Sequence, residues 1–298
     1  FTAGGRTAGG AGIDLAYTQA EAGFIEGGVN HVVICTDGDF NIGPYRDSEL
    51  VALIEDKRRS GVTLTALGFG RGDLNDSMME KVSNAGNGFC GVVGSEAQAD
   101  TYVSTRLLAT LDLIAKDMKI QVEFNPEMVH AYRLLGYENR AIADHLFRDD
   151  TVDAGEIGAG HRVTALYELV LTGDSIPRAE SAPEATDGEP VEGEREISAG
   201  DMVEVRVRYK AIDASDADPA FEVKQTLRPG AIVEATTEAD QDLQWAAAVA
   251  ATAEVLRHSP YVTSKVLDTV QTLVNAQADR DAERAQFAQL LDDARGML

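Results

Sequence analysis

Along the first third of the chain, segments whose apolar residues have helical spacing alternate with short runs typical of strands. Four segments have the apolar spacing of an amphipathic helix, and three short runs are apolar or β-branched, as in strands. The predicted helices are 7–24, 47–59, 75–83 and 97–116, and the predicted strands are 31–36, 62–67 and 89–93. The run at 31–36 is nearly all apolar, so we expect a strand that is buried on both faces. Strands that alternate with helices at this spacing predict βαβ units and a parallel sheet.

The pattern changes near residue 117 to alternating or β-branched runs separated by turn residues. The expected strands are 118–124, 129–135, 163–171, 202–209 and 221–226, in a β-rich, antiparallel region. Residues 176–196 are rich in Pro, Glu, Ala, Ser and Gly, which predicts a mobile loop. Helical spacing returns at 243–257, 262–276 and 282–294. These changes predict three parts, 1–117, 118–238 and 239–298.

Charge narrows the classes of partner. The 298 residues include 50 acidic and 26 basic ones, for a formal net charge of −24. Such a field repels the phosphates of nucleic acids and anionic membrane surfaces, so we expect neither as a partner. It favours divalent cations and basic protein patches, but the first interpretation of the charge is solubility alone, or a high-salt or acidic-proteome source. No apolar run reaches the length of a membrane span.

A hydroxyl and a carboxylate flank the first predicted helix and strand. Thr7 lies in a glycine-rich turn that leads into the helix, and Asp37 directly follows the strand. Ligands of open α/β sheets bind at the carboxyl ends of the strands, and Mg²⁺ prefers oxygen ligands of these two kinds. Asp39 and Asn41 are close enough to hold Asp37 or a metal-bound water. By spacing alone each has a structural alternative, because Thr7 would cap a helix and the other three would close a turn.

Three stretches carry a resemblance to a known family. They are residues 4–13 (GGRTAGGAGI), 32–43 (VVICTDGDFNIG) and 62–70 (VTLTALGFG). Together they resemble the latter half of a von Willebrand factor type A domain, and the turn TDGDFN is the most specific part. The resemblance implies a doubly wound, Rossmann-like α/β sheet over residues 1–117, with a metal-ion-dependent adhesion site at its upper edge.

A second resemblance covers the C-terminal part of the chain. Residues 246–251 (AAAVAA), 256–261 (LRHSPY) and 284–287 (RAQF) look like the C-terminal domain of unknown function in YfbK-like bacterial proteins. We therefore expect the α/β sheet to be followed by a β-rich, sandwich-like region over 118–238 and a helical segment over 239–298.

The first resemblance also implies a function. Thr7 matches the threonine of the second loop of the adhesion site, and Asp37 matches the aspartate of the third. The implied cofactor is a divalent cation, Mg²⁺ first and Mn²⁺ or Ca²⁺ as alternatives, whose coordination is completed by a carboxylate of a protein ligand. A non-enzymatic adhesion-type module of the bacterial cell envelope, or a secreted one, is the expectation, with no catalytic residue and no organic cofactor.

One departure from the family is plain. The Asp-x-Ser-x-Ser motif of the first loop occurs nowhere in the chain. The resemblance therefore implies that the site is incomplete here and that the sheet is incomplete at its N-terminal side. We expect a fragment of a longer protein, and the alternative is a chain that has lost full metal binding.

The family's strand order places one strand between Cys35 and Cys90. Strands two apart are about 9–10 Å from each other. That exceeds the separation of roughly 7 Å that a disulfide can bridge. We therefore predict two free, buried thiols.

Two other functions compete with metal-dependent binding. A nucleotide- or phosphate-binding enzyme module would use Gly68-x-Gly-x-Gly72, but the full dinucleotide motif is missing. A structural scaffold with a dead metal site is the third reading. The five histidines lack metal-ligand spacing, so we expect ordinary surface or edge residues.

Overall fold

A computed structural model describes most of the chain. The described residues are 9–36, 47–69, 74–107, 113–136, 142–143, 146–150, 154–174, 197–215, 218–262 and 265–295. Their contacts form two compact units. The first comprises Phe1–Lys119, Asp150–His161 and Arg208–Phe221, and the second comprises Ile120–Asp149, Arg162–Val207 and Glu222–Leu298.

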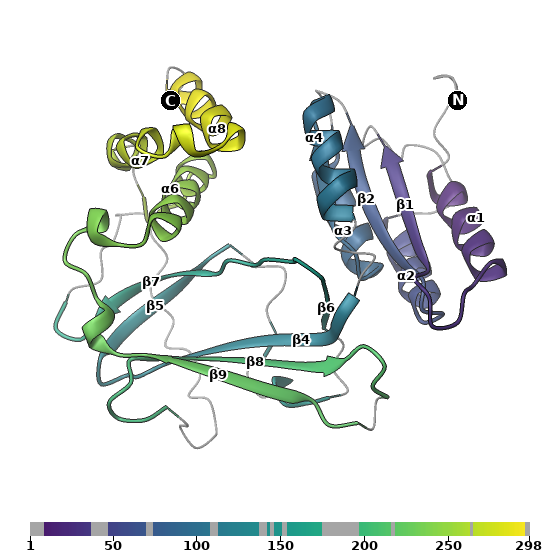
Figure 1. The fold of residues 1–298 in the computed structure, drawn as a ribbon, viewed down its shortest axis with the longest axis horizontal. Coiled ribbons are helices and arrows are strands. Elements are labelled where there is room, and N and C mark those ends of the chain that lie inside the picture. The colour runs from purple at the N-terminus through teal and green to yellow at the C-terminus, as the bar shows by residue number, and fades with distance from the viewer. Residues whose placement is uncertain are drawn as a thin grey trace. The chain divides into compact units, whose positions relative to one another are not determined.

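A three-stranded parallel sheet is the centre of the first unit (Figure 1). Its strands are β1 (His31–Thr36), β2 (Thr63–Phe69) and β3 (Cys90–Val93), in the order β1-β2-β3. Helix α1 (Gly9–Ala22) precedes β1, α2 (Asp47–Arg58) and α3 (Asp76–Ala85) connect the strands, and α4 (Glu96–Thr101) follows β3. His31 is in register with Thr63, and Ala66 with Cys90. The predicted parallel α/β order is confirmed.

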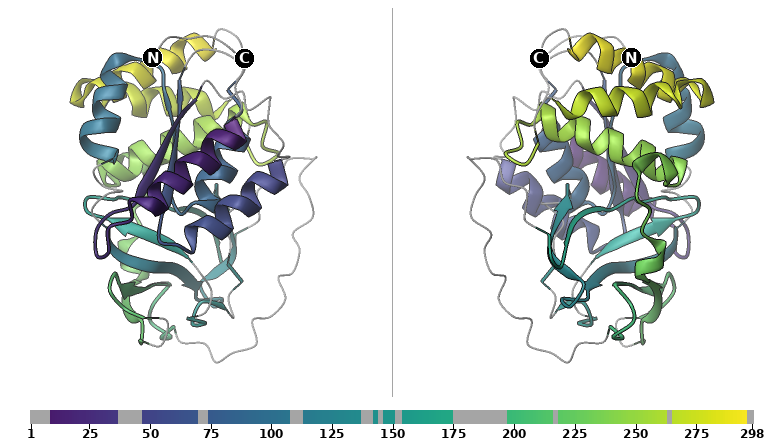
Figure 2. Two further views of the ribbon diagram at one scale, coloured as in Figure 1. Left: turned by 90° about the vertical axis from the view of Figure 1, so that its right-hand side faces the viewer. Right: turned by 90° about the vertical axis from the view of Figure 1, so that its left-hand side faces the viewer.

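Helices lie on both faces of this sheet, as in a doubly wound fold, but they cover the second face only in part. On one face α1, α2 and α3 pack together, and Tyr17, Ile54 and Leu64 are fully buried among them (Figure 2). On the other face Tyr102, in the helical turn that follows α4, lies directly against Gly91. A side chain at position 91 would collide with that ring, which explains the glycine.

Strand β1 is not buried on both faces, so that expectation was wrong. Val32 is 7% exposed beneath the helices, whereas Val33 on the opposite face is 39% exposed. Cys35 shares the exposed face with Val33. Neither cysteine forms a disulfide and β2 lies between their strands, as predicted, but Cys35 is exposed rather than buried and Cys90 is half-buried.

The helix predicted over 97–116 was too long. Helix α4 ends at Thr101 and continues as a wider turn, η1 (Tyr102–Arg106), and strand β4 begins at Leu113. Periodicity alone does not separate a short apolar run in a helix from one in a strand. Pairing decides here, because Leu113 is in register with Gly158 of β6, a strand that the sequence pattern did not reveal.

Two further sheets follow. In these sheets β4 pairs with β6, and β5 pairs with β7, in antiparallel orientation, as predicted. The strands of the larger sheet, in the order β6-β4-β8-β9, are Gly155–Gly158, Leu113–Phe124, Val203–Ala211 and Phe221–Leu227. The smaller sheet pairs β5 (Val129–Leu135) with β7 (Leu166–Leu171). In the second unit Val129, Met202 and Val203 form a buried apolar cluster that joins residues of the two sheets. The predicted loop at 176–196 lies outside the described residues.

Three helices close the chain, namely α6 (Gln241–Leu256), α7 (Val266–Asn275) and α8 (Ala282–Arg295). Short helical turns flank them at Pro229–Ala231, Thr236–Glu238 and Ala278–Arg280. Arg133 of β5 attaches α6 to the small sheet, because its guanidinium binds Glu254 of α6 and Glu168 of β7, each at 2.5 Å. Among the described residues, none of the helices is long and apolar enough to cross a bilayer.

Candidate metal centre

The four residues predicted for the metal site lie just outside the described ranges. Thr7 precedes α1, which begins at Gly9, and Asp37 directly follows β1, which ends at Thr36. Asp39 and Asn41 fall in the same undescribed segment as Asp37. The elements on which the candidate site depends are described, and they can be compared with the prediction.

Helix α1 and strand β1 are neighbours that run in opposite directions (Figure 1). Ile13 and Tyr17 of α1 pack in the same buried cluster as Val32 of β1. The first residue of α1 and the last residue of β1 therefore lie at the same edge of the sheet. Because the sheet is parallel, this is also the edge at which β2 and β3 end. It is the edge at which open α/β sheets bind ligands.

The described polar groups at the end of β3 serve local structure. The Ser95 hydroxyl accepts a hydrogen bond from the Gln98 amide at 3.2 Å and caps α4. The Gln98 side chain accepts a hydrogen bond from the Gly94 amide at 2.8 Å. Within the described ranges, moreover, histidine, cysteine and acidic side chains form no group of three that could hold a metal ion.

Gly68, near the end of β2, lies on the face of the sheet that α3 covers. A Cβ atom at this position would lie 2.8 Å from the terminal methyl group of Met79 in α3. That methyl group ends a flexible side chain, so a small shift of Met79 would make room for it. Gly70 and Gly72, the other glycines of the nucleotide-binding alternative, lie outside the described residues.

His31 is the polar residue of this sheet whose surroundings the sequence analysis missed. Its Nδ1 lies 2.5 Å from the Thr63 hydroxyl and its Nε2 lies 3.0 Å from the Thr65 hydroxyl. Burial lowers the pKa of His31 to about 4, so the ring is neutral at pH 7 and bridges two hydroxyls. His31 begins β1 and therefore lies at the opposite end of this strand from Asp37. The spacing of Thr63 and Thr65 indicates that one face of β2 is polar. Only the register of β2 with β1 shows that His31 contacts both hydroxyls.

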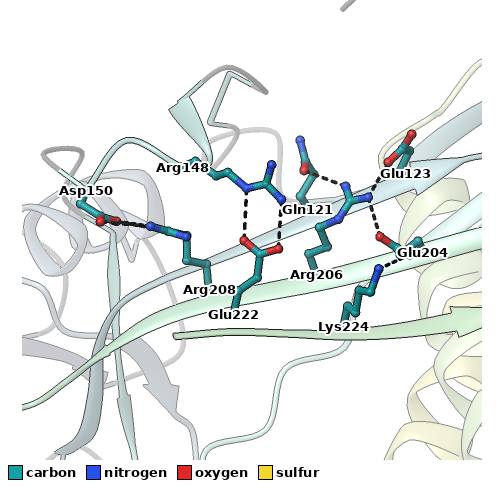
Figure 3. A network of polar contacts seen from close by, with 9 residues as sticks. All are labelled: Gln121, Glu123, Arg148, Asp150, Glu204, Arg206, Arg208, Glu222 and Lys224. Carbon is teal, nitrogen blue, oxygen red and sulfur yellow. Dashed lines mark hydrogen bonds and ion pairs between the residues drawn. The ribbon is translucent and has the colours of Figure 1, made fainter. Parts of the chain in front are cut away.

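A second polar cluster, in the second unit, lies on one face of β8 (Figure 3). Arg206 is 3% exposed, and its guanidinium pairs with Glu123 at 2.7 Å and with Glu204 at 2.5 Å. The same guanidinium donates a hydrogen bond to Gln121 at 3.2 Å. Lys224 of β9 pairs with the other oxygen of Glu204 at 3.3 Å. The charges offset one another, as expected for a structural network.

Two further arginine–carboxylate pairs appear in Figure 3. Arg148 donates to both carboxylate oxygens of Glu222, at 3.1 and 3.3 Å. In the first unit Arg208 binds Asp150 at 3.0 Å, and this hydrogen bond lowers the pKa of the Asp150 carboxyl. The alternation of charged and apolar residues along β8 was visible in the sequence, but their pairing was not.

Comparison with known proteins places the chain in a family. A family model described as "Uncharacterized protein YfbK, C-terminal" matches residues 109–297. The chain belongs to this family. This confirms the resemblance to YfbK-like proteins. "Uncharacterized protein YfbK" from Escherichia coli (strain K12) is 34% identical in an alignment of length 297 that covers 98% of this chain and 49% of that protein.

The chain thus spans about half the length of this curated relative. Among solved structures, "von Willebrand factor type A from Catenulispora acidiphila" is similar with a TM-score of 0.40 and 13% sequence identity. That similarity covers 92% of this chain and 61% of the other.

Proposed function

We propose that the chain binds a protein partner through a divalent cation at the carboxyl edge of the parallel sheet. Thr7 and Asp37 would hold the cation, with Mg²⁺ as the first candidate and Mn²⁺ or Ca²⁺ as alternatives. Asp39 and Asn41 would orient Asp37 or a metal-bound water. When bound, the cation supplies a positive centre that a carboxylate of the partner can coordinate.

One observation carries this proposal. The start of α1 and the end of β1 lie at the same edge of the sheet, so the fold brings together the chain positions that adjoin Thr7 and Asp37. A hydroxyl and a carboxylate are hard oxygen donors, which suits Mg²⁺ better than a softer metal. The net charge of −24 favours cations over anions in the surroundings of the site.

The role that we propose is binding rather than catalysis. Coordination of a carboxylate needs no nucleophile and no general base, and the sequence contains neither a Gly-x-Ser-x-Gly nor a His-Glu-x-x-His motif. On the resemblance to von Willebrand A-type proteins, we place this binding at the bacterial cell envelope or in the secreted fraction. Nucleotide binding gains no support from the glycines after β2, because the full dinucleotide motif is missing.

Calorimetric titration of the chain with Mg²⁺ and with Mn²⁺ tests the proposal. We expect saturable binding to the wild type and its loss in Asp37→Ala and Thr7→Ala. Asp56→Ala is the matched control for Asp37→Ala, because it removes the same charge from a side chain of α2 that is 75% exposed. Binding that is absent from the wild type, or that survives in Asp37→Ala, contradicts the proposal.

A further inference from the structure

Strand β9 is the outermost strand on its side of the four-stranded sheet, within the part of the chain that the structure describes. All of its residues except Thr226 are exposed. Phe221, Val223 and Leu227 share one face, since successive side chains of a strand alternate, and they are 57%, 56% and 46% exposed. An exposed edge strand with an apolar face favours pairing with another strand.

The backbone of β9 shows which residues face outward. The amide of Met202, the residue directly before β8, donates to the Leu227 carbonyl at 2.8 Å, and at the other end of β9 Phe221 packs on Tyr209. The two strands are therefore antiparallel, and Leu227 directs its backbone groups toward β8. Since these directions alternate along a strand, the N–H and C=O groups of Glu222, Lys224 and Thr226 point away from β8.

We propose that this edge pairs with the same edge of a second copy of the chain, antiparallel about a two-fold axis at Val223. The apolar residues of β9 have odd numbers. To keep them on one face of the joined sheet, odd-numbered residues of one copy must lie opposite odd-numbered residues of the other. An axis at Glu222 or at Lys224 would place two like charges directly opposite, which destabilises a strand pair.

An axis at Val223 instead places Glu222 of each copy opposite Lys224 of the other. Of the registers that place odd-numbered residues opposite odd-numbered ones, only this one pairs opposite charges that both lie within β9. An axis at Gln225 would pair Glu222 with Arg228, which lies beyond the end of the strand at Leu227. Glu222 and Lys224 also have partners within their own chain, Arg148 and Glu204, so each contact across the interface would extend the network of Figure 3.

The apolar faces of the two copies would then continue across the axis on the same side of the joined sheet. Val223 would meet its counterpart in a pair without mutual hydrogen bonds, the arrangement that brings side chains closest. One pair of strands buries less surface than a standard interface of roughly 1,600 Å². We therefore expect a dimer whose population rises with protein concentration.

Disulfide trapping tests the register in a Cys35→Ser/Cys90→Ser background. In a pair without mutual hydrogen bonds the Cα atoms are about 4.5 Å apart. A disulfide accepts about 4.4–6.8 Å. Oxidation of Val223→Cys should therefore yield a covalent dimer. Gln225→Cys is the matched control, because position 225 would face position 221 of the other copy and should stay monomeric. Both side chains are exposed, so neither change should affect folding.

Charge reversal tests the contact in the otherwise native chain by sedimentation. Glu222→Lys and Lys224→Glu should each raise the dissociation constant on the order of tenfold, because each creates two like-charge pairs across the axis. The double variant should restore the wild-type constant. Within one chain, by contrast, the double variant opposes Arg148 to a lysine and Glu204 to a glutamate, so intrachain contacts alone predict no rescue.

Several outcomes would overturn the proposal. A wild-type chain that stays monomeric at every concentration would show that β9 has no such partner, or that other residues of the same chain cover it. A cross-link through Gln225→Cys, or a dimer that Val223→Cys fails to trap, would exclude the proposed register. The dimer should persist in EDTA, so its failure and the failure of the metal site are distinguishable.

Discussion

The two main sheets bury different kinds of polar side chain. In the parallel sheet and its helices the buried polar residues are uncharged, namely Thr36, Thr65 and Ser83. The four-stranded sheet buries charges, namely Lys119, Glu204, Arg206 and Lys210. The first arrangement depends mainly on shape and volume, whereas the second depends on every charge keeping its partner. A buried charge in this protein is therefore evidence of pairing first and of chemistry only second.

The largest expected loss of stability comes from replacing Arg206, at the centre of the buried charges of the four-stranded sheet. Arg206→Ala leaves Glu204 and Glu123 without their shared cation, and Glu204 stays buried. Removing one partner of a buried pair costs about 3–5 kcal/mol of unfolding free energy. Urea denaturation of the variant measures this loss.

Arg148→Ala is the matched control, because its side chain is 49% exposed and its partner is Glu222. Glu222 is 25% exposed, so water reaches both side chains, and a pair screened in this way contributes about 0–1 kcal/mol. Equal losses in the two variants would show that the buried network does not stabilise the four-stranded sheet in the way described.

His31, at the start of β1, is a titratable residue whose charge the fold opposes. An unfolded histidine has a pKa of about 6.5, whereas burial lowers that of His31 to about 4. Between these values the unfolded chain binds more protons, so stability is complete above pH 6.5 and falls as the pH drops toward 4. The expected loss from this group is about 1–3 kcal/mol, since the pKa is good to about a unit and His31 is only partly buried.

Unfolding of the wild type and of His31→Gln at several pH values checks this. The variant should lose the part of the pH dependence between 6.5 and 4 that His31 supplies. His161→Gln is the control, because His161 is exposed, and it should follow the wild type. Identical pH profiles for all three proteins would contradict the role of His31.

The sequence predicted the parallel sheet better than it predicted which faces are covered. Periodicity located β1, β2 and β3 to within a few residues, because each is a short apolar run between helices. It could not show that Val33 and Cys35 are exposed, since burial depends on which helices pack on which face. It also missed β6, whose four residues Gly155–Gly158 include two glycines and have no strand pattern of their own.

The candidate site was predictable only in part, for a related reason. Local sequence marks Thr7 and Asp37 as polar positions at the ends of elements, and the fold confirms that the neighbouring ends of α1 and β1 share one edge. The charged cluster around Arg206 needed three-dimensional pairing instead, because Glu123 is distant from Arg206 in sequence and lies on another strand. Contacts between strands, not patterns within them, determine which charges are neutralised.

The smallest expected effect is a difference in stability between truncations on the two faces of β1. Val32→Ala and Val33→Ala remove the same atoms from adjacent positions, but Val32 is 7% and Val33 39% exposed. Val32 packs in the cluster with Ile13 and Leu64, so its truncation should cost about 1–2 kcal/mol of unfolding free energy, from lost burial and a small cavity. Val33→Ala should cost less than half of that, because its side chain is already partly in water. Denaturant unfolding of the two variants measures both losses. A larger loss for Val33→Ala would mean that another part of the molecule or a partner covers the exposed face of β1, and the contrast drawn between its two faces would then be wrong.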